Sequence, residues 1–127
     1  MKKENIIAYK MKLLAELSQH VGELHAIGMA ELYETVFAEA WQHRINDTKK
    51  LRELVTELRF EGIPICSVSK WQGGGYYLAA AKSELINYLS RSEHRALKIL
   101  ARNARIKKVS LPEYLGQMKL NMEGGRG

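Results

Sequence analysis

The sequence predicts a mainly α-helical fold with a small β-hairpin, followed by a long basic helix. The first observation is an amphipathic segment, residues 48–61, that ends at a glycine. The second is a pair of β-rich segments on either side of the glycine run 73–75, which is typical of a hairpin. The third is helical spacing of apolar residues in three further segments: residues 5–20, 29–41 and 81–108.

The chain has 127 residues, of which 46% are hydrophobic, and this fits one domain with a packed core. We expect a single domain over residues 1–108, with its long helix at about 82–108, and a partly disordered tail over 109–127. No apolar run approaches the ~18 residues that a membrane span needs, and the first residues lack a secretion signal. The single cysteine, Cys66, excludes a disulfide framework. These features favour an intracellular protein that does not enter membranes.

Positive charge is concentrated in the second half of the chain. Residues 1–61 carry 9 Lys/Arg and 10 Asp/Glu, whereas residues 62–127 carry 11 and 4. The formal net charge of +6 therefore arises after residue 61. Clustered positive charge suggests a polyanionic partner, most commonly DNA or RNA, although many basic proteins bind neither specifically.

Apolar faces define the helices before the hairpin, and a very short strand is expected at residues 26–28. In the first helix the face consists of Ile6, Ile7, Leu13, Leu14 and Leu17. In the second it consists of Leu32, Val36 and Phe37. We expect the third helix to begin near Asp47 or Thr48, because both residue types favour the N-cap. Its buried stripe has the spacing i, i+3, i+4, i+7: Leu51, Leu54, Val55 and Leu58.

The hairpin begins soon after the third helix ends. Gly62 supplies a left-handed cap and Pro64 prevents the helix from continuing. Strands are expected at residues 63–68 and 76–79, and the glycine run between them permits positive φ.

Two features of the hairpin bear on the core. Side chains of neighbouring strand residues point to opposite faces, so we expect one of Tyr76 and Tyr77 to be buried. Cys66 is expected to be a small core residue.

The fourth helix, residues 81–108, combines an apolar side with a basic face, and Ser83 is a candidate N-cap. The apolar side comprises Leu85, Leu89, Ala96, Ile99 or Leu100, and Ile106. It offers a surface for a homodimer. The basic face has the spacing i, i+4, i+7, i+11, i+14: Arg91, Arg95, Lys98, Arg102 and Arg105. Such a face either binds phosphates or is simply solvated, and we favour phosphates because the charge is nearly all of one sign.

A helix followed by a hairpin is how a winged helix-turn-helix domain contacts duplex DNA. We therefore predict a recognition helix at residues 48–61 with four outward residues near the bases: Lys49, Arg52, Glu53 and Thr56. Arg52 suits guanine and Glu53 suits cytosine, while Arg44 and the first amides of the helix suit a phosphate. Alternatively, Arg52 pairs locally or stays solvated. Against base contact, three acids lie on or near this helix: Glu53, Glu57 and Glu61.

The predicted wing tip, residues 69–75, contains three candidates for DNA contact. Lys70 and Gln72 suit the flanking backbone or the minor groove. Trp71 either stacks against the nucleic acid or folds back onto the domain, and the sequence does not choose between these.

The motifs of residues 25–108 resemble the winged-helix domains of small phage and prophage proteins. The matching runs are LRELVTELRFEGIPICS, then GGGYYLA, then a helix that starts near KSELINYL, with HAIGMAELYETVF upstream. The resemblance implies DNA binding in replication or transcription control, and a place in the bacterial cytoplasm, at the nucleoid or in a phage-infected cell. One departure is the long connection at residues 42–47, which puts a tight helix-turn-helix geometry in doubt.

The tail holds a short pattern of its own at residues 117–122, QMKLNM. It is similar to the peptide by which bacterial replication proteins dock on the sliding clamp, which implies contacts through Gln117, Leu120 and Met122. Met122 departs from the usual Phe or Leu. The alternative is an amphipathic end that packs on the domain.

Motifs of catalysis are not found in the sequence. The four histidines form no HExxH motif, and the glycine run is not followed by Lys and Ser/Thr as in a P-loop. We therefore expect no enzyme, cofactor or metal site. Three hypotheses remain: binding of double-stranded DNA, a protein-interaction module that docks on a replication partner, and RNA binding.

Overall fold

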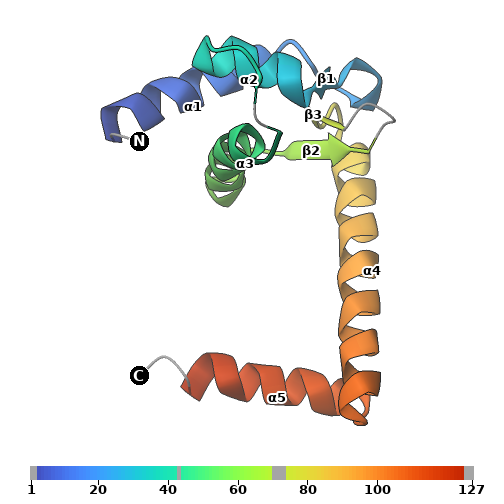
Figure 1. Cartoon of the computed structure of the whole chain (residues 1–127). Helices are drawn as coiled ribbons and strands as arrows, with labels where there is room; N and C mark the ends of the chain where they lie inside the picture. Colours follow the sequence, from blue (N-terminus) through green and yellow to red (C-terminus); the bar gives the residue numbers. More distant parts are fainter. Residues whose placement is uncertain (1–2, 43, 70–73, 125–127) are drawn as a thin grey trace. The chain divides into compact units, whose positions relative to one another are not determined.

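The structure, a computed structural model, describes residues 3–42, 44–69 and 74–124 (Figure 1). Within these residues the chain is mainly helical with a small antiparallel sheet, which confirms the predicted fold class at this level. The elements follow in the order α1 (Lys3–Leu17), η1 (Glu23–His25), β1 (Ile27–Gly28), α2 (Met29–Phe37), α3 (Arg44–Phe60), β2 (Ile65–Val68), β3 (Gly75–Leu78), α4 (Lys82–Lys107) and α5 (Leu111–Gly124).

The chain divides into two compact units, Met1–Leu85 and Ile86–Gly127. The division falls inside α4, whereas the domain expected from the sequence extends to residue 108. The tail contains more secondary structure than expected: α5 extends over Leu111–Gly124. Residues 125–127 lie outside the described part of the chain.

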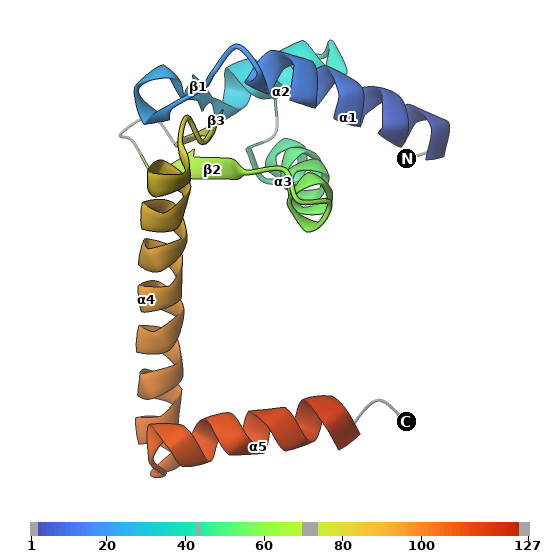
Figure 2. The same cartoon turned by 180° about the vertical axis from the view of Figure 1, so that it is seen from behind.

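The sheet of the first unit has the strand order β1-β3-β2, and both pairings are antiparallel. β3 is the central strand, with Tyr76 opposite Ile27 on one side and Tyr77 opposite Cys66 on the other. Figure 2 shows the sheet from behind, with α3 beside one end of β2. This order of elements and strands is compatible with a winged helix.

The core of the first unit lies between α1, α2, α3 and the sheet. All four residues of the predicted α3 stripe are at most 4% exposed, and the predicted face of α2 is buried as well. The α1 prediction was partly wrong: Leu13 and Leu17 are fully buried, but Ile7 is 55% exposed. The reason is helical phase, since residue 7 lies about 120° around the helix from residue 13.

Three helix boundaries differ from those expected. α1 ends at Leu17, three residues before the expected end. α2 ends at Phe37 because Ala38 adopts a left-handed conformation with φ 55°. The chain then turns back, and the Trp41 ring packs edge-on against Tyr33 at 5.5 Å between centroids. α3 begins at Arg44, before the N-cap residues that we expected. Its C-terminal end agrees with the prediction, since Gly62 has φ 94° and the Ile63 N–H donates to the Leu58 carbonyl.

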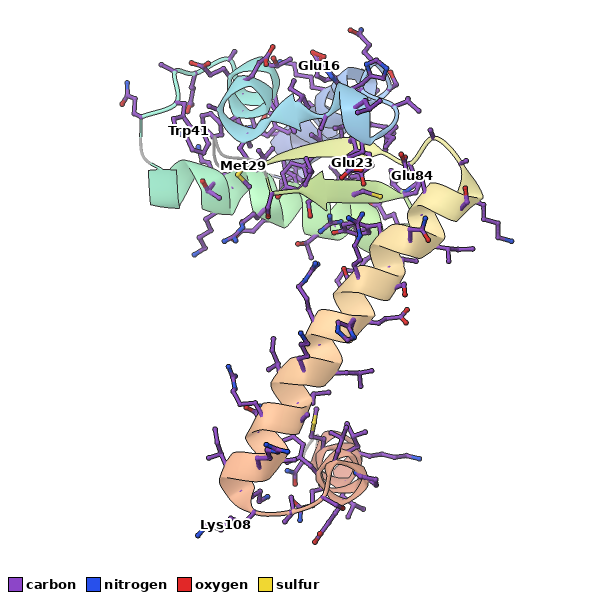
Figure 3. The ribbon with its side chains drawn as sticks, turned by 90° about the vertical axis from the view of Figure 1, so that its right-hand side faces the viewer. Glu16, Glu23, Met29, Trp41, Glu84 and Lys108 are labelled. Atoms are coloured by element: carbon purple, nitrogen blue, oxygen red, sulfur yellow. The ribbon has the colours of Figure 1, made fainter. Side chains whose placement is uncertain are left out.

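The start of α4 is held by Glu84 in place of the expected Ser83. The Ala80 N–H donates to Glu84 Oε1 at 2.8 Å, and the Glu23 N–H donates to Glu84 Oε2 at 3.2 Å. One carboxylate thus joins the first turn of α4 to η1, as Figure 3 shows. A carboxylate in the first turn also interacts favourably with the helix dipole.

Both tyrosines of β3 are buried, so the expectation of one core tyrosine was wrong. Tyr76 is 5% exposed and belongs to the main core, with the Arg59 guanidinium 5.9 Å from its ring centroid. Tyr77 is fully buried on the other face of the sheet, opposite Cys66, which is buried as predicted. Both faces of the central strand are therefore covered.

Replacing Tyr77 by phenylalanine is expected to leave the protein at least as stable at neutral pH. The Tyr77 hydroxyl is buried without a nitrogen or oxygen partner among the described residues, and the nearby Cys66 thiol is a weak hydrogen-bonding group. Burial raises the pKa of Tyr77 to about 12 from its ordinary 10. Between these values only the unfolded chain ionises, so the free energy of unfolding falls by up to about 1.4 kcal/mol per pH unit.

Urea unfolding of the wild type and Tyr77→Phe at several alkaline pH values measures this difference. We expect a shallower loss of stability in the variant. A variant that is clearly less stable at neutral pH would show that the hydroxyl has a strong partner after all.

Candidate nucleic-acid interface

The outward face of α3 carries the residues predicted to contact DNA. Lys49, Arg52, Glu53 and Thr56 are all exposed, and Phe60 on the same side is 89% exposed. Among the described residues, the side chains of the first four take part in no ion pair or hydrogen bond. The fold therefore brings these side chains together on one free surface.

The charged residues on the flanks of α3 are instead tied to the rest of the domain. Toward α2, Lys50 Nζ lies 5.3 Å from the Phe37 ring centroid and 3.9 Å from Glu39 Oε2. Toward the sheet, Arg59 Nε donates to the Ile65 carbonyl at 2.9 Å. These contacts hold the helix with its outward face away from the core.

The third set of contacts joins α3 to α1 through Lys10. Lys10 Nζ lies 2.7 Å from Glu61 Oε2 and 3.9 Å from Glu57 Oε1. The hydrogen bond to Glu61 raises the pKa of Lys10, so the ammonium stays charged beside the two carboxylates. The negative charge of two of the three acids that argue against DNA contact, Glu57 and Glu61, is thereby partly compensated. The sequence offered no signal for this, because the partners are about fifty residues apart.

Four predicted DNA-contact residues cannot be placed fully. Lys70, Trp71 and Gln72 of the expected wing lie outside the described residues. Arg44 lies in the first turn of α3, but its side chain is outside the described part of the structure.

The second unit carries the predicted basic face on α4. All five cations of this face are exposed, and α4 is continuous through them. Two of them contact neutral side chains: Arg95 donates to Ser92 at 3.2 Å and Arg102 to Asn103 at 3.4 Å. Within the described part of the chain, no acid forms an ion pair with any of the five. This surface is therefore suited to bind a polyanion.

The predicted apolar side of α4 is largely uncovered. Ala104 is the one buried residue recorded for this helix, whereas Leu89 is 45% exposed, Ile99 49% and Ile106 74%. The structure holds one chain, so the homodimer stays a prediction.

Residues 117–122, which are similar to the peptide that docks on the sliding clamp, lie within α5. Gln117 Oε1 accepts a hydrogen bond from Lys107 Nζ at 2.6 Å, and Leu120 is 71% exposed. The side chain of Met122 is outside the described residues. Lys108, labelled in Figure 3, marks the turn before this helix and has φ 64°.

The described residues hold neither a metal-ligand cluster nor a membrane-spanning helix. No group of three His, Cys, Asp or Glu in the described ranges is placed to hold a metal ion. None of the described helices combines the length and apolar character of a membrane span. Comparisons of the chain with protein-family models, curated proteins and solved structures gave no significant match.

Proposed function

We propose that this protein is a non-enzymatic, DNA-binding winged-helix protein of the phage and prophage type, with a role in replication or transcription control. In this proposal α3 enters the major groove, and the wing and the basic face of α4 contact phosphates. The observation that carries it is the outward face of α3. Its polar side chains are free, while the charged groups on both flanks are engaged within the domain.

Two physical arguments support the proposal. A helix with one buried stripe and one polar, exposed side fits the major groove, where arginine and glutamate distinguish base pairs. The exposed cations of α4 supply the sequence-independent attraction that a helix of mixed charge lacks. The role in replication or transcription rests on the family resemblance.

The test is a binding titration of the full chain against three labelled ligands of equal length: duplex DNA, single-stranded DNA and structured RNA. We expect duplex DNA to bind most tightly, with an affinity that falls steeply with salt. A preference for structured RNA would favour RNA binding. No binding to any of the three at low salt would contradict the proposal and favour a protein-interaction module.

Replacing Arg52 by alanine is expected to weaken binding at a preferred duplex site by roughly tenfold, because a bidentate base contact contributes about 1–3 kcal/mol. The preferred site is first selected from a random duplex pool. Lys12→Ala is the matched control, since Lys12 is an exposed cation on α1 that forms no ion pair among the described residues. Equal losses in both variants would mean that Arg52 acts only through its charge.

A further inference from the structure

Lys10 has an unusual position for a cation on the first helix. Its side chain is only 22% exposed, yet its ammonium group is within 4 Å of two carboxylates of α3. Those carboxylates, Glu57 and Glu61, are themselves half exposed, at 50% and 55%. The pair therefore remains close to the solvent in which DNA would lie.

The position of these acids on α3 makes their charge relevant to DNA. The major groove is about 12 Å wide, so a helix inside it has phosphates along both flanks. Glu57 and Glu61 follow the outward residues Glu53 and Thr56 around the helix toward α1, on one flank. Without a partner, both carboxylates would lie within roughly a Debye length, ~8–10 Å, of phosphates and would repel them.

Stability alone does not account for this arrangement. A solvent-exposed ion pair contributes little to folding, and α1 already packs on the core through Leu13 and Leu17. The consequence that the geometry favours is electrostatic: the Lys10 ammonium halves the negative charge of this flank, from −2 to −1.

We propose that Lys10 is a charge-compensating residue of the DNA-binding surface, which acts through Glu57 and Glu61 without contacting DNA. The inference rests on the proposed function of α3. It adds that Lys10 of α1 makes the electrostatic potential around α3 less negative.

The experiment measures the affinity of the full chain for one duplex at several salt concentrations, together with unfolding in urea. The variants are Lys10→Ala, the pair Glu57→Gln with Glu61→Gln, and all three changes combined. Lys12→Ala is again the control, because it removes the same charge from the same helix without a carboxylate partner among the described residues.

We expect Lys10→Ala to weaken binding about tenfold at low salt, and less at high salt because of screening. Lys12→Ala should change it less than about threefold. The Glu57→Gln, Glu61→Gln pair should bind more tightly than the wild type, and the triple variant should recover at least wild-type affinity, because its flank carries no charge where the wild type carries −1. A structural role alone would lower the urea midpoint without this recovery.

Two outcomes would overturn the inference while leaving the proposed function intact. One is an equal effect of Lys10→Ala and Lys12→Ala, and the other is a triple variant that binds as weakly as Lys10→Ala although it is folded. If the wild type itself binds no duplex, the proposed function fails and the inference with it.

Discussion

Neutralising the basic face of α4 is expected to remove most of the salt dependence of DNA binding. The variant combines five changes: Arg91→Gln, Arg95→Gln, Lys98→Gln, Arg102→Gln and Arg105→Gln. Each cation that neutralises a phosphate contributes about 0.9 to the slope of log affinity against log salt. If all five do so, the slope becomes shallower by about 4.5, and binding at low salt is at least 100-fold weaker.

The prediction follows from the state of these side chains in the structure. All five are exposed and form no ion pair with an acid among the described residues, so they are free to exchange counterions for phosphates. Glutamine keeps a good helix propensity, so α4 is expected to persist in the variant. Circular dichroism checks that the helix content is unchanged.

Two double variants, each of which removes two positive charges, test whether the position of the lost charges matters. Arg95→Gln with Arg102→Gln removes two charges from the basic face, whereas Lys82→Gln with Lys119→Gln removes two exposed charges elsewhere. We expect the first pair to lower the slope by about 2 and the second to change it little. Equal slopes for both pairs would show that the basic face is only a solvated surface.

The parts of the fold that were predicted correctly are those with a dense local signal. Four apolar residues at helical spacing defined the buried stripe of α3, and Gly62 with Pro64 marked its end. The boundary of α2 was missed because Ala38, Glu39 and Ala40 are ordinary helix residues in sequence. Contacts made in the folded chain distinguish them: the Trp41 ring packs on Tyr33, and the Tyr33 hydroxyl donates to Glu39 Oε2 at 2.9 Å.

The candidate site was predictable to a similar degree. The phase of the α3 stripe sufficed to predict that Lys49, Arg52, Glu53 and Thr56 face outward. The compensation of Glu57 and Glu61 by Lys10 was not predictable, because it depends on how two helices distant in sequence pack together. Electrostatic balance at a surface is a tertiary property, and composition alone overstated the acidity of α3.

The glycine run shows the same division between local and tertiary information. We expected it to provide positive φ for a turn, and Gly74 does have φ 86°. Gly75 has another role, since it is the first residue of β3 and pairs with Gly28 of β1. The backbone of Ile27 in β1 lies so close to Gly75 that a side chain at residue 75 has no room.

Replacing Gly75 by alanine is therefore expected to destabilise the first unit by about 3 kcal/mol, the upper end of the usual cost of overpacking. The new methyl group would collide with the Ile27 carbonyl oxygen, and it would lie 3.0 Å from the carbonyl carbon. Both are backbone atoms that cannot rotate away. β1 would have to move from β3, which would expose Ile27, now 3% exposed in the core.

Gly28→Ala is the matched control, because Gly28 is the residue paired with Gly75 but has no heavy atom near its missing methyl group. Its φ of −65° suits any residue. Alanine would make the unfolded chain less flexible, a gain of up to about 1 kcal/mol, but Gly28 is also the N-cap of α2, where alanine is less favourable than glycine. We therefore expect a net change of less than about 1 kcal/mol. Urea unfolding of the two variants beside the wild type measures the difference. If Gly75→Ala is as stable as Gly28→Ala, the close approach of β1 and β3 is not maintained in solution, and the support that β1 gives to the core is smaller than the structure indicates.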